Sequence, residues 1–141
     1  MSSPSAASLS ERRHETVMKH VAAENAGDVD GTIASFDRPR YNVIAMGSIS
    51  EGEASVRTLL SGLLTAFPDF HFEVGRVLHA DEAIVVEGVM EGTQRADWAG
   101  IPARGNRMAV PAACIFDFEG ERLVNETVYF DFAMLQRQLA L

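Results

Sequence analysis

The sequence predicts an α+β protein in which three N-terminal helices and a short C-terminal helix pack on a strongly curved, mostly antiparallel sheet. Helix-period apolar patterns fill the first half of the 141 residues, and strand-period patterns fill the second half from Phe70 onward. Most connections between the expected strands are of hairpin length, which favours antiparallel neighbours. Helices that are segregated from strands along the chain pack as a layer on one face of a sheet.

The first helix follows a Ser-, Ala- and Pro-rich segment at residues 1–8, which we expect to be a disordered tail before a single domain at residues 9–141. Ser10 is the expected N-cap, and Gly27 is the expected stop. His20 lies about 60° around the helix from Val17, at the edge of the apolar stripe, so it faces either the interior or the surface.

Two more helices and a strand complete the first half. A short helix is expected from an Asp28 cap to Phe36, and a long helix from Gly52 to Phe67. The segment YNVIAM at residues 41–46, between these helices, is predicted to be a strand.

The second half contains four expected strands: Phe70–His79, Ala83–Thr93, Met108–Phe118 and Arg122–Asp131. A long loop at residues 94–106 separates the second strand from the third and carries Trp98. This tryptophan either covers an apolar ligand or plugs the end of the core.

Composition excludes several classes of partner. The chain has 20 Asp and Glu against 12 Lys and Arg, and its formal charge of −8 opposes binding to nucleic acid or to anionic membranes. The single cysteine allows no internal disulfide, and neither a secretory signal nor a membrane-spanning run is apparent. We therefore expect a cytoplasmic protein.

The sequence motifs predict neither a metal ion nor a cofactor. The four histidines show no metal-ligand spacing, and no glycine-rich phosphate-binding loop is present. Acid–base chemistry by carboxylates remains the strongest chemical possibility.

The last expected strand carries the first catalytic candidates. Strand alternation separates two faces, one with Leu123, Asn125, Thr127, Tyr129 and Asp131 and the other with Val124, Glu126, Val128 and Phe130. Asp131 closes the mixed face and either transfers a proton beside Tyr129 or serves as the N-cap of the helix that begins at Phe132.

Two further acids lie within expected strands. Glu87 and Glu126 each face either solvent or a cavity, and alternation alone leaves both alternatives open. The full set of ligand-binding candidates comprises Trp98, Ile44, Met46, Phe67, Glu87, Cys114 and Thr127.

Four segments, AFPDFHFEV, the Gly92-Thr93 pair, DWAGIPARGNRM and YFDFAMLQRQLAL, together resemble the SnoaL-like polyketide cyclase family over about residues 17–141. The resemblance implies the cone-shaped fold of the nuclear transport factor two superfamily, a homodimer and a pocket inside the cone. It also implies a cofactor-free aldol ring closure in which an aspartate, matched here by Asp131, is the general acid and base.

A second resemblance, through VAAENAGDVDG and VPAACIFDF, is to ketosteroid isomerase. That enzyme needs a tyrosine and two acids, and the matching positions here hold His20, Ile44 and Cys114. The isomerase mechanism is therefore not expected in that form.

The leading hypothesis is a cofactor-independent cyclase or isomerase that acts on an apolar, carbonyl-bearing, polyketide-like small molecule. Asp131 moves the proton in this hypothesis, and Tyr129 and His20 are the candidate donors. The alternatives are a non-catalytic small-molecule-binding protein and an interaction module that works through its sheet.

Overall fold

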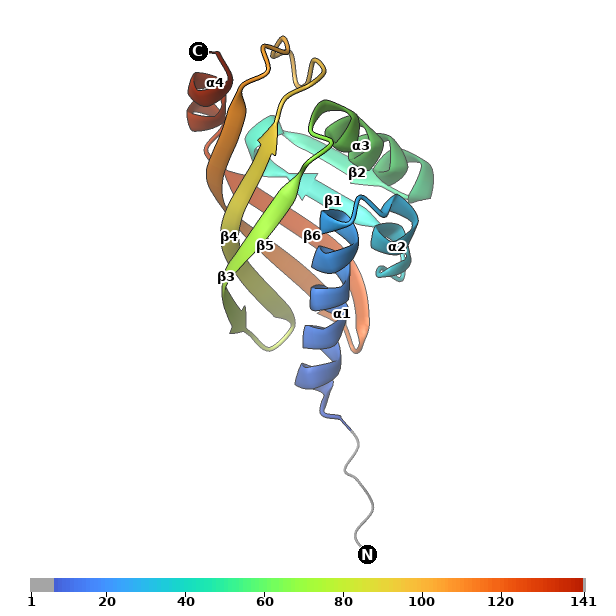
Figure 1. Cartoon of the computed structure of the whole chain (residues 1–141). Coiled ribbons are helices and arrows are strands. Elements are labelled where there is room, and N and C mark those ends of the chain that lie inside the picture. The colour runs from blue at the N-terminus through green and yellow to red at the C-terminus, as the bar shows by residue number, and fades with distance from the viewer. Residues whose placement is uncertain (1–6, 141) are drawn as a thin grey trace, which may run out of the picture.

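The computed structural model describes residues 7–140 (Figure 1). The tail expected at residues 1–8 therefore lies outside the described residues, apart from its last two positions. The elements, in chain order, are α1 (Leu9–Asn25), α2 (Val29–Ala34), β1 (Arg40–Val43), the 3-10 turn η1 (Ile44–Met46), β2 (Ser48–Glu51), α3 (Glu53–Ala66), β3 (His71–His79), β4 (Ala83–Thr93), β5 (Arg107–Glu119), β6 (Arg122–Phe130) and α4 (Phe132–Ala140).

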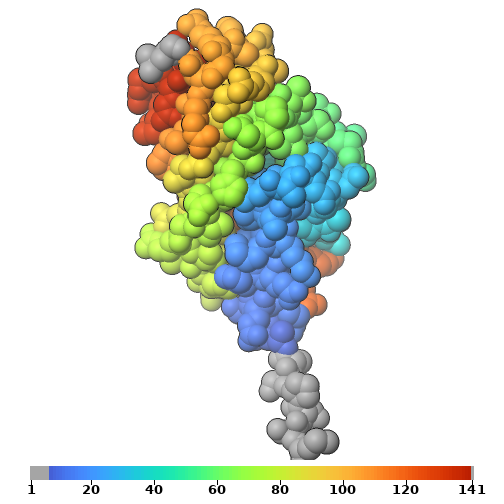
Figure 2. All heavy atoms as spheres, viewed as in Figure 1, coloured from blue at the N-terminus to red at the C-terminus, as the bar shows by residue number. Residues whose placement is uncertain are grey.

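The strands form one curled six-stranded sheet in the order β2-β1-β6-β5-β4-β3. Every neighbouring pair is antiparallel except β1 and β6, which are parallel. Helices α1, α2 and α3 lie on the concave side, and α4 lies near one end of the roll (Figures 1 and 2). The predicted α+β class, with helices on one face of a curved and mostly antiparallel sheet, is confirmed.

The start of α1 differs from the sequence-based expectation. Ser8, not Ser10, is the N-cap, because its hydroxyl accepts a hydrogen bond from the Glu11 N–H at 3.1 Å. The predicted stop is correct, since Gly27 has the left-handed conformation (φ 68°) that ends the helix. Asp28 caps α2 by accepting from the Gly31 N–H at 2.9 Å.

The strand expected at residues 41–46 is shorter than predicted. It ends at Val43, and Ile44–Met46 form a 3-10 turn that Gly47 closes with φ 60°. This turn reverses the chain into β2, which the sequence analysis did not predict, because the apolar run continues through the turn.

A register shift in β6 corrects the predicted division of its two faces. The β5 partners of Leu123 and Asn125 are adjacent residues, so Val124 is an extra residue on β6. Leu123 consequently lies in the core with 1% exposure. It shares the inner face of β6 with Glu126, whereas strict alternation had placed it on the face of Thr127.

The core fills the space between the concave face and the helices. Its fully buried members come mainly from α1, α3, the strands and α4, and they include Val17, Val56, Val86, Phe116 and Leu135. No helix in the described part of the chain is long and apolar enough to cross a lipid bilayer.

Gly88 on β4 tests the close packing of the sheet. A Cβ at this position would lie 2.2 Å from the Glu73 carbonyl oxygen and 2.7 Å from the Phe72 ring. We predict that Gly88→Ala lowers the free energy of unfolding by about 1–3 kcal/mol, because the backbone and ring must move. The control is Gly62→Ala in α3, where a Cβ meets nothing within 4 Å and helix propensity should add about 0.5–1 kcal/mol. Urea denaturation measures both, and equal stability of the two variants would contradict the described packing.

Candidate functional site

A cavity opens between the concave face of the sheet and helix α3. It contains about 660 Å³ of space free of protein atoms, counted out into the solvent at its open mouth, and about 80 Å³ of this space is open to the centres of water-sized molecules. The lining residues are Glu24, Tyr41, Val43, Met46, Leu59, Leu60, Leu63, Phe70, Phe72, Met90, Trp98, Met108, Cys114, Glu126, Val128, Phe130 and Leu135. The walls are therefore almost entirely apolar.

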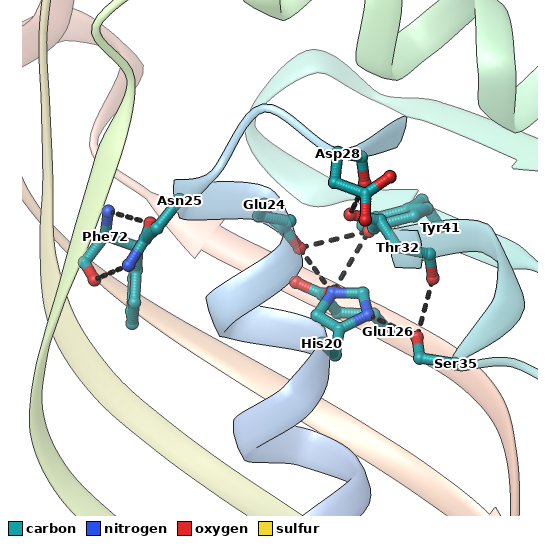
Figure 3. Close-up of polar contacts among 9 residues, drawn as sticks. All are labelled: His20, Glu24, Asn25, Asp28, Thr32, Ser35, Tyr41, Phe72 and Glu126. Atoms are coloured by element: carbon teal, nitrogen blue, oxygen red, sulfur yellow. Dashed lines mark hydrogen bonds and ion pairs between the residues drawn. The ribbon is translucent and has the colours of Figure 1, made fainter. Parts of the chain in front are cut away.

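The polar part of the lining comes from four residues on four different elements. Glu24 lies on α1, Tyr41 on β1, Cys114 on β5 and Glu126 on β6. The parallel pairing of β1 with β6 places Tyr41 directly beside Glu126 in the sheet. The two acids and the phenol therefore belong to the same cluster (Figure 3).

His20 lies at the centre of this cluster and is fully buried. Its Nε2 atom lies 2.8 Å from Glu126 Oε1 and also contacts Glu24 Oε1, one helical turn further along α1. The Tyr41 hydroxyl lies 3.2 Å from the same nitrogen and donates to Glu24 Oε1 at 3.2 Å. One imidazole therefore meets two carboxylates and a phenol.

The hydrogen bonds on the far side of the ring fix its protonation. The Ser35 hydroxyl donates its only proton to the Thr32 carbonyl at 2.6 Å, and it lies 2.8 Å from His20 Nδ1. Ser35 can then only accept from Nδ1, so this nitrogen carries a proton. Because Nε2 faces two carboxylates, a second proton is shared there, and the ring is best described as an imidazolium.

The pKa of His20 follows from the groups that surround its ring. Burial alone would lower its pKa, but attraction to Glu24 and Glu126, together with hydrogen bonds to them, raises the pKa to about 10. Burial and the negative charge of Glu24 raise the pKa of Glu126, whereas His20 opposes that rise. The cluster thus holds a cation beside an acid that retains its proton more readily than an ordinary glutamate does.

The other two polar groups remain neutral at ordinary pH. Burial, followed by the charge of Glu24, raises the pKa of the Tyr41 phenol well above its usual value. Burial, followed by the charge of Glu126, raises the pKa of the Cys114 thiol. Tyr41 is therefore a hydrogen-bond donor here, and Cys114 is not a thiolate nucleophile.

The donor set of His20, Glu24 and Glu126 is also the kind that binds divalent metals, since one ligand atom from each lies within 4.8 Å of the others. Ligands about 2.1 Å from a metal are separated by roughly 3 Å or more. Nε2 is closer than that to both carboxylates. The arrangement fits shared protons better than a metal ion.

The sequence-predicted catalytic residues separate in the structure. His20 is in the cluster, but Tyr129 is 45% exposed and Asp131 is exposed at the start of α4. The Asp131 carboxylate accepts from the Met134 N–H at 3.0 Å, which is the helix-cap role that the sequence left open. Neither Tyr129 nor Asp131 is among the residues that line the cavity.

The ligand-binding candidates divide in the same way. Met46, Trp98 and Cys114 line the cavity. The other four candidates do not line it. Ile44 is 43% exposed, and Phe67 is buried in the core against the Trp98 ring. Glu87 forms an ion pair with Arg76 on the outer face of the sheet, and the Thr127 hydroxyl accepts a hydrogen bond from Asn125 at 3.0 Å.

Sequence reasoning missed Glu24 and Tyr41 and left Glu126 undecided. One signal was present, because His20 and Glu24 are four residues apart on a helix and therefore share a face. Tyr41 had no comparable local signal, since its partners are on α1 and its neighbour in the sheet is on β6.

Comparison with known proteins identifies one family and one fold. The sequence profile of the family described as SnoaL-like polyketide cyclase matches residues 12–139. No curated protein matches the chain in sequence.

Three solved structures illustrate the likeness of fold. A candidate polyketide cyclase from Xanthomonas campestris pv. campestris is 20% identical with a TM-score of 0.84, over 94% of this chain and 99% of that one. AclR from Streptomyces galilaeus, a candidate hydroxylase, is 21% identical with a TM-score of 0.79, over 94% and 98%. A candidate SnoaL-like polyketide cyclase from Jannaschia sp. CCS1 is 17% identical with a TM-score of 0.79, over 98% of each chain.

Replacing His20 tests the buried ion pair. We predict that His20→Gln lowers the free energy of unfolding by about 3–5 kcal/mol at pH 6, because it leaves the buried Glu126 and the partly buried Glu24 without their cation. The stabilisation by His20 is complete below its unfolded pKa of about 6.5. It is lost as the pH rises through about 10, since the folded-state pKa is the higher one.

The matched control is His71→Gln on β3, where the exposed ring pairs with Glu73 at 2.8 Å and a surface pair is worth roughly 0–1 kcal/mol. Urea titrations at several pH values provide the measurement. A His20→Gln effect that is small, or that grows with rising pH, would contradict the charged cluster.

Proposed function

The chain belongs to the SnoaL-like polyketide cyclase family, and we propose that it is a cofactor-independent cyclase or isomerase for an apolar, carbonyl-bearing small molecule bound in the cavity. The observation that carries this proposal is a buried glutamate on the wall of an apolar cavity. Glu126 is 3% exposed and lines the cavity, and its Oε1 atom lies 2.8 Å from His20 Nε2. An acid in this position is available to exchange a proton with a ligand.

The proposed reaction begins with proton transfer from the carbon next to the ligand's carbonyl group. The Glu126 carboxylate takes this proton, and the electron pair of the broken C–H bond moves onto the carbonyl oxygen. Tyr41 lines the cavity, and its neutral hydroxyl, which donates to Glu24 in the free protein, turns to donate a hydrogen bond to that oxygen. The enolate carbon then attacks a second carbonyl, which closes a ring, and Glu126 returns its proton to the alkoxide that forms. In an isomerisation, Glu126 instead returns the proton to a different carbon of the conjugated enolate.

The electrostatics of the cluster support Glu126 as the base. A carboxylate whose pKa is raised by burial binds a carbon-derived proton more strongly than an exposed carboxylate does. His20 is a positioning residue in this proposal, because its protonated ring lies behind Glu24 and Glu126 and does not line the cavity.

The second candidate function is non-catalytic binding of the same class of molecule. It is favoured by the almost uniformly apolar walls, which retain an apolar ligand without any reaction. The two candidates share the cavity and differ only in whether Glu126 transfers a proton.

We also propose that the chain forms a homodimer through the outer face of its sheet, and that it acts in the cytoplasm. Paired strand residues share a face, and the sheet register aligns Leu78, Val85 and Ile115 in one apolar row. Leu78 is 43% exposed, and Ile49, which lies beyond Thr127 and Asn42 along the same line of paired residues, is 57% exposed. A second copy of the chain would cover this row.

Matched amide substitutions test the proposed base. A thermal-shift screen of polyaromatic ketones selects a ligand, and NMR follows deuterium exchange from solvent into the carbon next to its carbonyl. We predict that Glu126→Gln slows this exchange by about 10²–10⁴-fold and changes ligand affinity only a few-fold, because the amide keeps the shape and loses the base.

Asp131→Asn is the matched control and should exchange at the wild-type rate. Loss of exchange in Asp131→Asn but not in Glu126→Gln would transfer the role to the helix cap, as the family resemblance implies. Wild-type protein that binds the ketone without any exchange would favour the binding-protein alternative.

The dimer proposal has a separate test. We predict that Ile115→Lys converts a sedimenting dimer to a monomer, because it introduces two buried positive charges near the centre of the interface. Circular dichroism provides the check on folding. A wild-type monomer at tens of micromolar would contradict the proposal.

A further inference from the structure

The charges on the cavity wall are all of one sign. Among the residues that line the cavity, the only ones with charged side chains are Glu24 and Glu126. The one cation near them, His20, is fully buried behind the wall and does not reach the cavity. A ligand in the cavity therefore meets carboxylates and no positive group.

The cluster has an excess of acid over base. Glu24 and Glu126 each form an ion pair in the described part of the chain, and in both cases the partner is His20. Two carboxylates against one imidazolium leave a charge of −1 when all three are ionised. Because Glu24 and Glu126 both line the cavity, this excess negative charge lies on the cavity wall.

The remaining walls suit a positively charged ligand with an apolar body. Phe70, Phe72, Trp98 and Phe130 contribute aromatic rings to the lining, and ring faces attract alkylammonium groups. An alkylammonium group is also weakly hydrated when its substituents are carbon, so its transfer into an apolar cavity costs less than that of a small ion.

We propose that the cavity selects molecules in which an alkylammonium group is attached to an apolar body, with the nitrogen directed at Glu24 and Glu126 and the body against Trp98. The proposal shares the cavity with the proposed function and deepens it by naming the charge class of the ligand. It excludes ligands with a free carboxylate, which two like charges would repel.

Binding of an ammonium group at the cluster is coupled to the release of protons. The titratable groups that face Glu126 are His20 and Glu24 from α1, Tyr41 from β1 and Cys114 from β5. Glu126 holds a proton more readily than usual because burial and Glu24 disfavour its charge. A bound ammonium group replaces that proton, so binding releases protons and becomes tighter as the pH rises.

The test compares two probes of the same shape on the wild-type protein. Benzyltrimethylammonium and neopentylbenzene differ only in the charged nitrogen that replaces a carbon. Trp98 is the only tryptophan and lines the cavity, so its fluorescence reports binding of either probe. We expect the cation to bind at least tenfold more tightly, with calorimetry in two buffers showing proton release.

Three variants localise the effect. Glu126→Gln and Glu24→Gln should each reduce the preference for the cation by about tenfold, whereas Glu87→Gln on the outer face should leave it unchanged.

Equal affinity of the two probes overturns this inference while the proposed function stands. Binding of the cation without any binding of neutral ketones supports the inference and contradicts the proposed function. If neither probe changes Trp98 fluorescence nor raises the melting temperature, the inference is overturned.

Discussion

The ion pairs of the buried His20 determine the form of the site. Removing a charge from water costs several kcal/mol, so a fully buried imidazolium is stable only beside carboxylates that remain ionised or share its proton. Glu24 supplies one such partner from the next turn of α1, and Glu126 supplies the other from β6. Ser35 orients the opposite side of the ring from the end of α2. Helix α1 therefore has to dock on the sheet in one position and one rotation.

The same docking creates the cavity. The His20 cluster holds α1 near β6. Asn25, at the end of α1, holds β3, because its side chain donates a hydrogen bond to the Phe72 carbonyl and accepts one from the Phe72 N–H. The sheet between these two contacts curls around a space that α3 covers. The apolar walls exclude water from one side of the cluster, and this exclusion raises the pKa of Glu126. A structural ion pair and a reactive acid thus arise from one arrangement.

The sequence predicted the fold better than the site. Hairpins are local, so periodicity and turn residues were sufficient to predict strands β3 to β6 and the pairing of β3 with β4 and of β5 with β6. Alternation separated two faces of each strand, but which face is inner depends on where α1 and α3 dock. That long-range packing decided that Glu126 is inner and that Glu87 is outer. Asp131 carried the signature of a helix cap and adopts that role in the structure, whereas the family resemblance had favoured it as the acid. Tyr41 joins the cluster through the parallel β1–β6 pair, which no local pattern reveals.

We infer that a ligand in the cavity reaches the buried acid cluster, and a crystal structure of the protein with a bound polyaromatic ketone tests this inference. We expect the body of the ligand to contact Trp98. Its carbonyl oxygen should lie within about 3.5 Å of the Tyr41 hydroxyl, and the adjacent carbon within about 3.5 Å of the Glu126 carboxylate, close enough for hydrogen bonding and proton transfer. A ligand bound on the outer face beside Tyr129 and Asp131, or one in the cavity whose carbonyl points away from Glu126, would contradict it.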